Sequence, residues 1–174
     1  MKVKDVMKTT PLVYCTTETI LQEAAKIMKT ANCGVLPVLN GDEKIVGIVT
    51  DRDICLSLAR DFSWSHSRLP VTEIMSEEVH SVNESDNLTN ALKKMRVHFI
   101  GRLPVVDDHG KIKGMLSIHD LFSKTLLQNE DLGQLSSSGE NIVKTVKALS
   151  DRYAIRRHKK MLEELKKSEL KFVI

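Results

Sequence analysis

Aromatic residues and long apolar runs are scarce in this 174-residue chain. Phe, Trp and Tyr together make up 4% of it, which argues against a surface that stacks the bases of single-stranded nucleic acid on exposed rings. No apolar run approaches the roughly 18 residues needed to cross a bilayer. The N-terminus also lacks the apolar stretch of a secretory signal. We therefore expect a cytoplasmic protein with no membrane partner.

Cysteine pairs and catalytic signatures are absent from the sequence as well. Cys15, Cys33 and Cys55 are an odd number with no close pair, which predicts buried, reduced thiols. The six histidines show neither i, i+4 spacing nor a cysteine at ligand spacing, which argues against a metal site. No phosphate-binding loop of the Gly-x-x-x-x-Gly-Lys-Ser/Thr type, Gly-x-Ser-x-Gly elbow or His/Cys/Asp nucleophile set occurs. We predict a protein that is not an enzyme and has no catalytic residue, metal or cofactor.

The composition is that of an ordinary soluble globular protein, with 41% hydrophobic and 28% charged residues. The net charge of +3 is unevenly distributed. Residues 140–174 hold ten Lys or Arg and five Asp or Glu, a net of +5, so the rest of the chain is slightly acidic. The basic character therefore belongs to a C-terminal tail.

An internal repeat organises the chain up to position 126. Three blocks recur in the same order: Lys4–Met7 as Thr72–Met75, Leu36–Val38 as Leu103–Val105, and Gly47–Ile54 as Gly114–Leu121. Recurrence in order at a nearly constant separation indicates a duplication. The separation shortens by one position after the first block, which a single deletion explains.

Each copy has the pattern of a helix followed by a hairpin. The spacing from Leu21 to Met28 predicts an amphipathic helix capped by Thr16 or Thr17. The second helix runs from Leu88 to Met95 with Ser85 or Asp86 as its cap. Two apolar runs follow in each copy and predict hairpins, over 34–39 and 44–49 and over 103–106 and 112–116. A last helix begins after Thr50 or Ser117.

We therefore predict an α/β (α+β) fold built from two strand–helix–strand–strand–helix units. One unit alone cannot bury both of its faces, so the two copies are expected to pack around a pseudo-twofold axis. The predicted boundaries are 1–60 for the first repeat, 61–69 for a connector, 70–126 for the second repeat and 127–174 for a helical basic tail.

The chemistry of the repeat lies in a Gly-x-x-Thr/Ser-x-x-Asp pattern. Thr50 and Ser117 begin helices, whose unpaired N–H groups and dipoles suit a phosphate. Asp53 and Asp120 lie one turn later, where a carboxylate can accept hydrogen bonds from a ribose diol. The alternative for each pair is a plain capping box. The presence of the whole Gly-x-x-Thr/Ser-x-x-Asp pattern at the same point in both copies favours ligand binding over simple capping.

These blocks together resemble a CBS domain, present twice in tandem as in a Bateman module. The resemblance rests on Val6-Met7, Ala24–Met28, Gly34–Val38 and Gly47–Asp53 in the first copy and on Gly101–Asp107 and Gly114–Asp120 in the second. It implies a regulatory module that binds AMP, ADP, ATP or an S-adenosyl compound in the clefts between repeats. It also implies a homodimer and signalling by a change in the arrangement of repeats or subunits to an effector protein that the sequence does not identify.

The resemblance implies two sites, each shared between the repeats. One would combine Thr50 and Asp53 with Val79, His80, Ile100, Gly101 and Arg102. The other would combine Ser117 and Asp120 with Thr10, Leu12, Cys33 and Gly34. Arg102 can clamp a phosphate, whereas Val35 stands at the equivalent position of the first copy. We predict that the Asp53 site favours phosphorylated ligands and that the Asp120 site is weaker or more apolar.

The role of the C-terminal tail, residues 127–174, is open. Apolar residues recur near helical spacing between Ile142 and Ile155 and again from Met161 to Leu165, which predicts one or two amphipathic helices. These helices would pack on the repeats, pair with a second subunit or contact an acidic partner. The basic run Arg156–Lys160 is typical of a solvated helix face, which argues against nucleic-acid binding as its role. The alternatives to a sensor are an interaction or dimerisation module with a vestigial nucleotide site and a nucleic-acid-associated regulator that acts through this tail.

Overall fold

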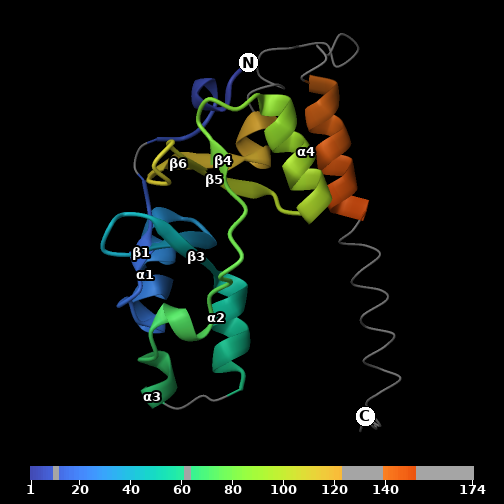
Figure 1. The fold of residues 1–174 in the computed structure, drawn as a ribbon. Helices are drawn as coiled ribbons and strands as arrows, with labels where there is room; N and C mark the ends of the chain where they lie inside the picture. The colour runs from blue at the N-terminus through green and yellow to red at the C-terminus, as the bar shows by residue number, and fades with distance from the viewer. Residues whose placement is uncertain (10–11, 61–63, 123–138, 152–174) are drawn as a thin grey trace, which may run out of the picture. The chain divides into compact units, whose positions relative to one another are not determined.

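The computed structural model describes residues 1–9, 12–60, 64–122 and 139–151 (Figure 1). Its elements in chain order are η1 (Val3–Asp5), β1 (Cys15–Thr16), α1 (Leu21–Ala31), β2 (Val35–Leu39), β3 (Ile45–Thr50), α2 (Asp51–Leu58), α3 (Trp64–Ser67), η2 (Val71–Glu73), β4 (Val82–Asn83), α4 (Leu88–His98), β5 (Arg102–Val106) and β6 (Ile112–Ser117). Two further helical stretches cover 118–122 and 139–151. The described chain divides into two compact units, one made of Lys2–Asp86 and Leu103–Leu116 and the other of the remaining residues.

The predicted duplication and the mixed α+β fold are confirmed. The leading 3-10 helices η1 and η2 begin at Val3 and Val71, whereas β1 and β4 begin at Cys15 and Val82, a separation that is shorter by one position. The later matched elements keep this shorter separation. The deletion therefore falls between the leading 3-10 helix and the first strand. The predicted hairpins lie within one residue of their observed bounds.

Each copy forms a three-stranded sheet, with strand orders β1-β2-β3 and β4-β5-β6. The short first strand pairs in parallel with the second, through Cys15 and Val38 in one copy and Val82 and Val105 in the other. The Asn40 side chain closes the β2–β3 turn, because its Oδ1 accepts hydrogen bonds from the N–H groups of Asp42 and Lys44.

The predicted caps of the first helices are wrong. Helix α1 begins at Leu21 after Ile20, and α4 begins at Leu88 after Asn87. Two of the predicted residues lie in the preceding turns instead. Thr16 N–H donates to Thr19 Oγ1, and the two hydroxyl oxygens of Thr16 and Thr19 lie 3.3 Å apart. In the second copy Asp86 Oδ2 accepts from Asn83 N–H. Polar side chains that bond within such a turn compete with capping.

Backbone groups at or just before the start of the other repeat cap these helices. Leu21 N–H donates to the carbonyl of Leu69 at 2.9 Å, just before the second repeat. Leu88 N–H donates to the carbonyl of Met1 at 3.2 Å, at the start of the first. The repeats therefore exchange their leading segments reciprocally, which a pattern read within one repeat cannot show.

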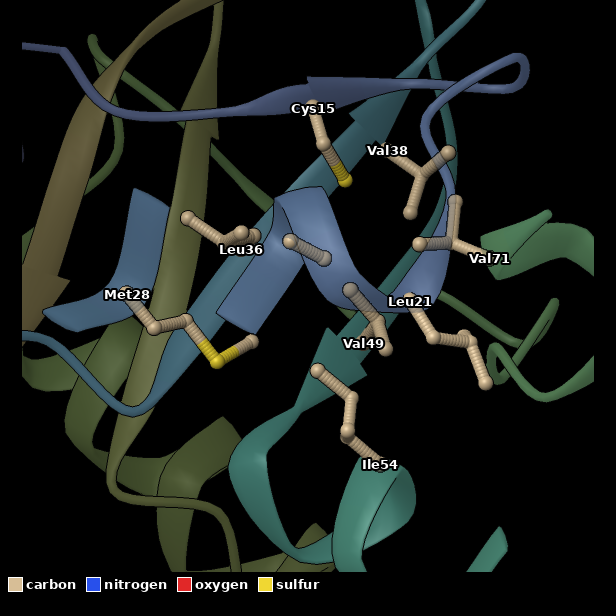
Figure 2. Packing of buried hydrophobic residues seen from close by; sticks show 9 residues of the cluster. Cys15, Leu21, Met28, Leu36, Val38, Val49, Ile54 and Val71 are labelled. Atoms are coloured by element: carbon tan, nitrogen blue, oxygen red, sulfur yellow. The ribbon is translucent and has the colours of Figure 1, made fainter. Parts of the chain in front are cut away.

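The same exchange completes the core of the first repeat. Buried residues of β1, α1, β2, β3 and α2 form one cluster, with Leu21, Leu36 and Val49 fully buried (Figure 2). Val71 of η2, from the second repeat, is also fully buried in it. Because Val71 fills space among first-repeat side chains, the first repeat depends on the second for its packing.

The predicted burial of all three cysteines is wrong in part. Cys15 is buried, Cys33 is half-buried, and Cys55 is exposed on α2. Burial raises the pKa of the Cys15 thiol to about 11, and its Sγ lies 3.7 Å from the carbonyl oxygen of Pro37. The thiolate of Cys15 is therefore scarce at neutral pH.

Alkylation of Cys15 is expected to be slow in the native protein at pH 8 and fast in urea. The thiolate is the nucleophile, and a raised pKa keeps the thiol protonated until the pH approaches 11. Peptide mapping by mass spectrometry after iodoacetamide treatment measures this. Equal labelling of Cys15 with and without urea would contradict the burial.

Candidate functional site

The first motif forms a complete capping box at the start of α2. Thr50 is the N-cap, and its Oγ1 accepts from Asp53 N–H at 3.2 Å. The Asp53 carboxylate returns the contact, because its Oδ2 accepts from Thr50 N–H at 2.9 Å and from Thr50 Oγ1–H at 2.7 Å. Both side chains are half-buried. The capping alternative is therefore realised in the first repeat, and it holds Asp53 rigidly.

The expected unpaired N–H groups are not found at this helix start. Asp51 N–H donates to the carbonyl of Gly34 at 3.2 Å, and Arg52 N–H donates to Asp51 Oδ1 at 2.7 Å. Asp53 N–H is taken by Thr50. What remains for an anion is the positive end of the helix dipole, without free N–H donors.

Asp53 keeps one oxygen for other contacts. All of its hydrogen bonds with described residues use Oδ2 or its backbone N–H, so Oδ1 accepts none from that part of the chain. A carboxylate oxygen has more than one acceptor direction. Capping and binding of a hydroxyl group are therefore compatible at this residue.

The second motif has related local geometry. Ser117 Oγ accepts from His119 N–H at 3.3 Å, and Ile118 N–H donates to the carbonyl of Gly101 at 2.9 Å. The Ile118–Gly101 bond is the counterpart of the Asp51–Gly34 bond in the first copy. The structure thus places Gly34 beside the Thr50 motif and Gly101 beside the Ser117 motif, each within its own repeat.

The remaining predicted site residues are placed as follows. Leu12, Cys33, Val79 and Ile100 are half-buried, as is His80, whose Nε2 lies 3.6 Å from Glu78 Oε1. Arg102 is exposed and forms no ion pair with the residues that the structure describes. Thr10 lies outside the described residues. The two crosswise combinations, Thr50 and Asp53 with 100–102 and Ser117 and Asp120 with 10–34, stay predictions.

The motif glycines allow close packing, as the absence of a Cβ at Gly47 and Gly114 predicts. Gly47 of β3 packs against the Met75 side chain, and Gly114 of β6 packs against the backbone oxygen of Lys8, so an added Cβ would overlap either neighbour. These neighbours come from the leading segments, which form bridges from Ser76 to Ile48 and from Lys8 to Met115. The recurrence of Met7 and Met75 before each bridge was the available signal.

Both repeats match the same protein-family model. The model described as "CBS domain" matches residues 3–60 and again 67–126. The chain belongs to the CBS domain family.

Relatives of this CBS pair include whole small proteins and parts of enzymes. It is 37% identical over 131 residues to the CBS domain-containing protein YhcV of Bacillus subtilis, which covers 75% of this chain and 89% of that protein. It is 38% identical over 128 residues to a homoserine O-acetyltransferase of Methanocorpusculum labreanum, covering 74% of this chain but only 25% of the enzyme. A CBS pair is thus found both nearly alone and attached to a larger protein.

Two similar solved structures contain adenosine compounds. The CBS domain pair of protein MJ0100, in complex with 5-methylthioadenosine and S-adenosyl-L-methionine, is 28% identical with a TM-score of 0.65, covering 74% of this chain and 98% of that one. The CBS domain protein PAE2072 of Pyrobaculum aerophilum, complexed with AMP, is 26% identical with a TM-score of 0.62, covering 70% and 90%. Such neighbours support a ligand-binding regulatory module.

Two other features were searched for within the described ranges: a membrane-spanning helix and a metal site. No helix there is long and apolar enough to cross a membrane. No group of three or more His, Cys, Asp or Glu side chains there is arranged to hold a metal ion.

Proposed function

We propose that this CBS pair is a non-enzymatic sensor of adenosine-containing ligands, with Asp53 as the main contact to the ribose. The observation that carries the proposal is the Asp53 carboxylate, held by Thr50 through Oδ2 while Oδ1 accepts no hydrogen bond from described residues. A half-buried, oriented acceptor of this kind suits a ribose hydroxyl group.

The ligands of the two similar structures support the same chemistry. AMP, 5-methylthioadenosine and S-adenosyl-L-methionine share an adenosine group and differ in what the 5′ carbon carries. An acceptor for the ribose diol serves all three, so Asp53 and Asp120 do not select among them. Selection then falls to groups near the 5′ substituent.

Arg102 is the residue that we expect to select for phosphate. It is exposed at the first position of β5, and its fork of donors matches a phosphate group. Its counterpart Val35 is half-buried and has no charge. Because the N–H groups at the start of α2 are already paired, a phosphate near Thr50 would depend on Arg102 more strongly than the motif alone implies.

Regulation would follow from differential binding. A ligand that contacts both repeats stabilises one arrangement of them over another. The difference between its binding free energies for the two arrangements limits how far it can shift the equilibrium between them. We propose that the readout is a change within a homodimer, passed to an effector protein. The tail residues 152–174 lie outside the described part of the chain. They are a candidate for the contact with the effector protein because their net charge is positive, which suits an acidic partner.

A ligand panel tests the proposal. We expect AMP, ADP, ATP, 5-methylthioadenosine or S-adenosylmethionine to raise the Tm of the purified protein, whereas guanosine does not. A ligand at 100 times its Kd adds about 2.7 kcal/mol to the free energy of unfolding, which a thermal-shift assay detects. If every adenosine compound leaves the Tm unchanged, the protein is an interaction module with a vestigial site.

A further inference from the structure

Helix 139–151 packs on the second repeat beside α4 (Figure 1). Ile142 and Thr145 are buried, with exposed fractions of 3% and 0%, and Leu149 is half-buried. These three residues lie on one face of the helix, because they are separated by three and four positions. The opposite face is exposed and carries charged residues such as Lys144. The helix is therefore amphipathic and docks through one defined face.

A buried hydroxyl group fixes the position of this helix along α4. Thr145 Oγ1–H donates to the carbonyl of Asn141 at 2.7 Å, and Thr145 Oγ1 accepts from Arg96 Nη1 at 2.9 Å. The hydroxyl thus uses both its donor and an acceptor direction. If the helix slid along α4, this buried oxygen would lose the Arg96 donor, and the loss would cost free energy.

The last turns of the helix lie against Gly101. A Cβ added at Gly101 would lie 3.4 Å from Ile118 Cγ2 and 3.9 Å from Leu149 Cδ1, so both side chains are close to this glycine. The Gly101 carbonyl also accepts from Ile118 N–H at 2.9 Å. Gly101 therefore lies between the helical residues that follow Ser117 and the end of helix 139–151.

The equivalent glycine of the first repeat has a different neighbour. A Cβ added at Gly34 would meet the carboxylate of Asp51 first, with Oδ2 at 2.7 Å. In the register of the duplication Asp51 stands at the position of Ile118, so a charged group replaces the apolar contact. Covering that carboxylate with a leucine would cost free energy. The two predicted sites therefore differ in what lies beside this glycine.

We propose that helix 139–151 is a positioning element for the ligand site to which Gly101 and Arg102 belong, and that ligand binding and docking of the helix strengthen each other. The inference rests on the proposed function, in which these two residues contribute to the Asp53 site. A docked helix restrains the backbone at Gly101 before the ligand binds, so less binding free energy is lost in ordering it. Bound ligand in turn favours the docked helix, because coupling between two binding events is reciprocal.

The place of the helix in the chain connects this coupling to the proposed effector contact. Residues 152–174, the candidate for that contact, follow the helix directly. A ligand that strengthens docking of helix 139–151 therefore acts on the point from which the basic segment extends. Arg96 and Thr145 are positioning residues in this scheme, since they act on the site through the helix and not by touching the ligand.

Loosening the helix tests the coupling in the full-length protein. Thr145→Val combined with Leu149→Ala removes the hydroxyl contact and the contact with Gly101, so we expect the Kd for AMP from isothermal titration calorimetry to rise about fivefold or more. The matched control is Lys144→Ala combined with Lys147→Ala, on the exposed face of the same helix, which is expected to change the Kd by less than about twofold. Thr145→Ser keeps the hydroxyl group and should bind AMP as the wild type does.

Hydrogen exchange gives the reciprocal readout without any variant. Saturating AMP should slow the exchange of backbone amides in 142–149 by about fivefold or more in the wild type. Only amides that exchange faster than those of the α1 core count, because they report local opening of the helix and not global unfolding. If AMP binds but either readout is unchanged, the helix is a passive cover and the inference is wrong. A wild type that does not bind AMP instead overturns the proposed Asp53 site, and the inference with it.

Discussion

Replacing Gly114 with alanine is expected to lower the free energy of unfolding by about 2 to 3 kcal/mol, near the upper end for overpacking. A Cβ at this position would overlap the backbone oxygen of Lys8 and would lie 3.2 Å from its carbonyl carbon. Lys8 is held there by a bridge to Met115, so the backbone must shift and the bridge must weaken. Urea denaturation followed by circular dichroism measures the loss.

Two other glycines provide the controls. Gly47→Ala meets only the Met75 side chain, which is flexible, so we expect a smaller loss than at Gly114. Gly41→Ala meets nothing within 4 Å and is expected to be neutral or slightly stabilising. If Gly114→Ala were as stable as Gly41→Ala, the exchanged leading segment would not pack on β6 as described.

Asp53→Ala is expected to reduce the affinity for AMP by about 10- to 100-fold, since a hydrogen bond to a charged group contributes about 1.5–3 kcal/mol and each tenfold change corresponds to about 1.4 kcal/mol. Isothermal titration calorimetry measures the affinity. The same substitution removes the carboxylate half of the capping box at the start of α2, through Oδ2 and Thr50, and should cost about 1 kcal/mol of stability. Affinity and stability must therefore be measured separately.

Asp86→Ala separates those two effects. Asp86 also uses a carboxylate to close a local turn, through Oδ2 and Asn83 N–H, yet it belongs to neither predicted site. We expect it to lose stability without losing affinity. A loss of affinity equal to that of Asp53→Ala would indicate that general destabilisation, and not a ribose contact, explains the effect.

Comparison with Asp120→Ala and Arg102→Ala tests the predicted inequality of the two sites. We expect Asp120→Ala to weaken AMP binding less than Asp53→Ala does. Arg102→Ala should weaken AMP and ATP but leave 5-methylthioadenosine unchanged, because only the first two carry phosphate. Arg60→Ala, an exposed arginine just after α2, is the matched control. Equal losses in Asp53→Ala and Asp120→Ala would refute the asymmetry.

Local patterns predicted the secondary structure well where the information was local. Short apolar runs on either side of a turn located β2 and β3, and the apolar spacing located α1. The caps were missed because Thr16 and Asp86 act in turns one step earlier, and the helix N–H groups bond to Leu69 and Met1. Nothing near Leu21 in the sequence points to a partner so far along the chain.

By itself the sequence determined that the protein is a duplicated CBS pair and that each copy carries a Thr/Ser-x-x-Asp motif. Both features can be recognised without the fold, because the matching blocks recur at a nearly fixed separation along the sequence. Only the tertiary structure decided that Asp53 caps α2 through Oδ2 and leaves Oδ1 without a partner among the described residues, and that the N–H groups beside it are already paired. Hydrogen-bond partners and packing neighbours depend on which segments meet in space, and the exchange of leading segments between the repeats decides that.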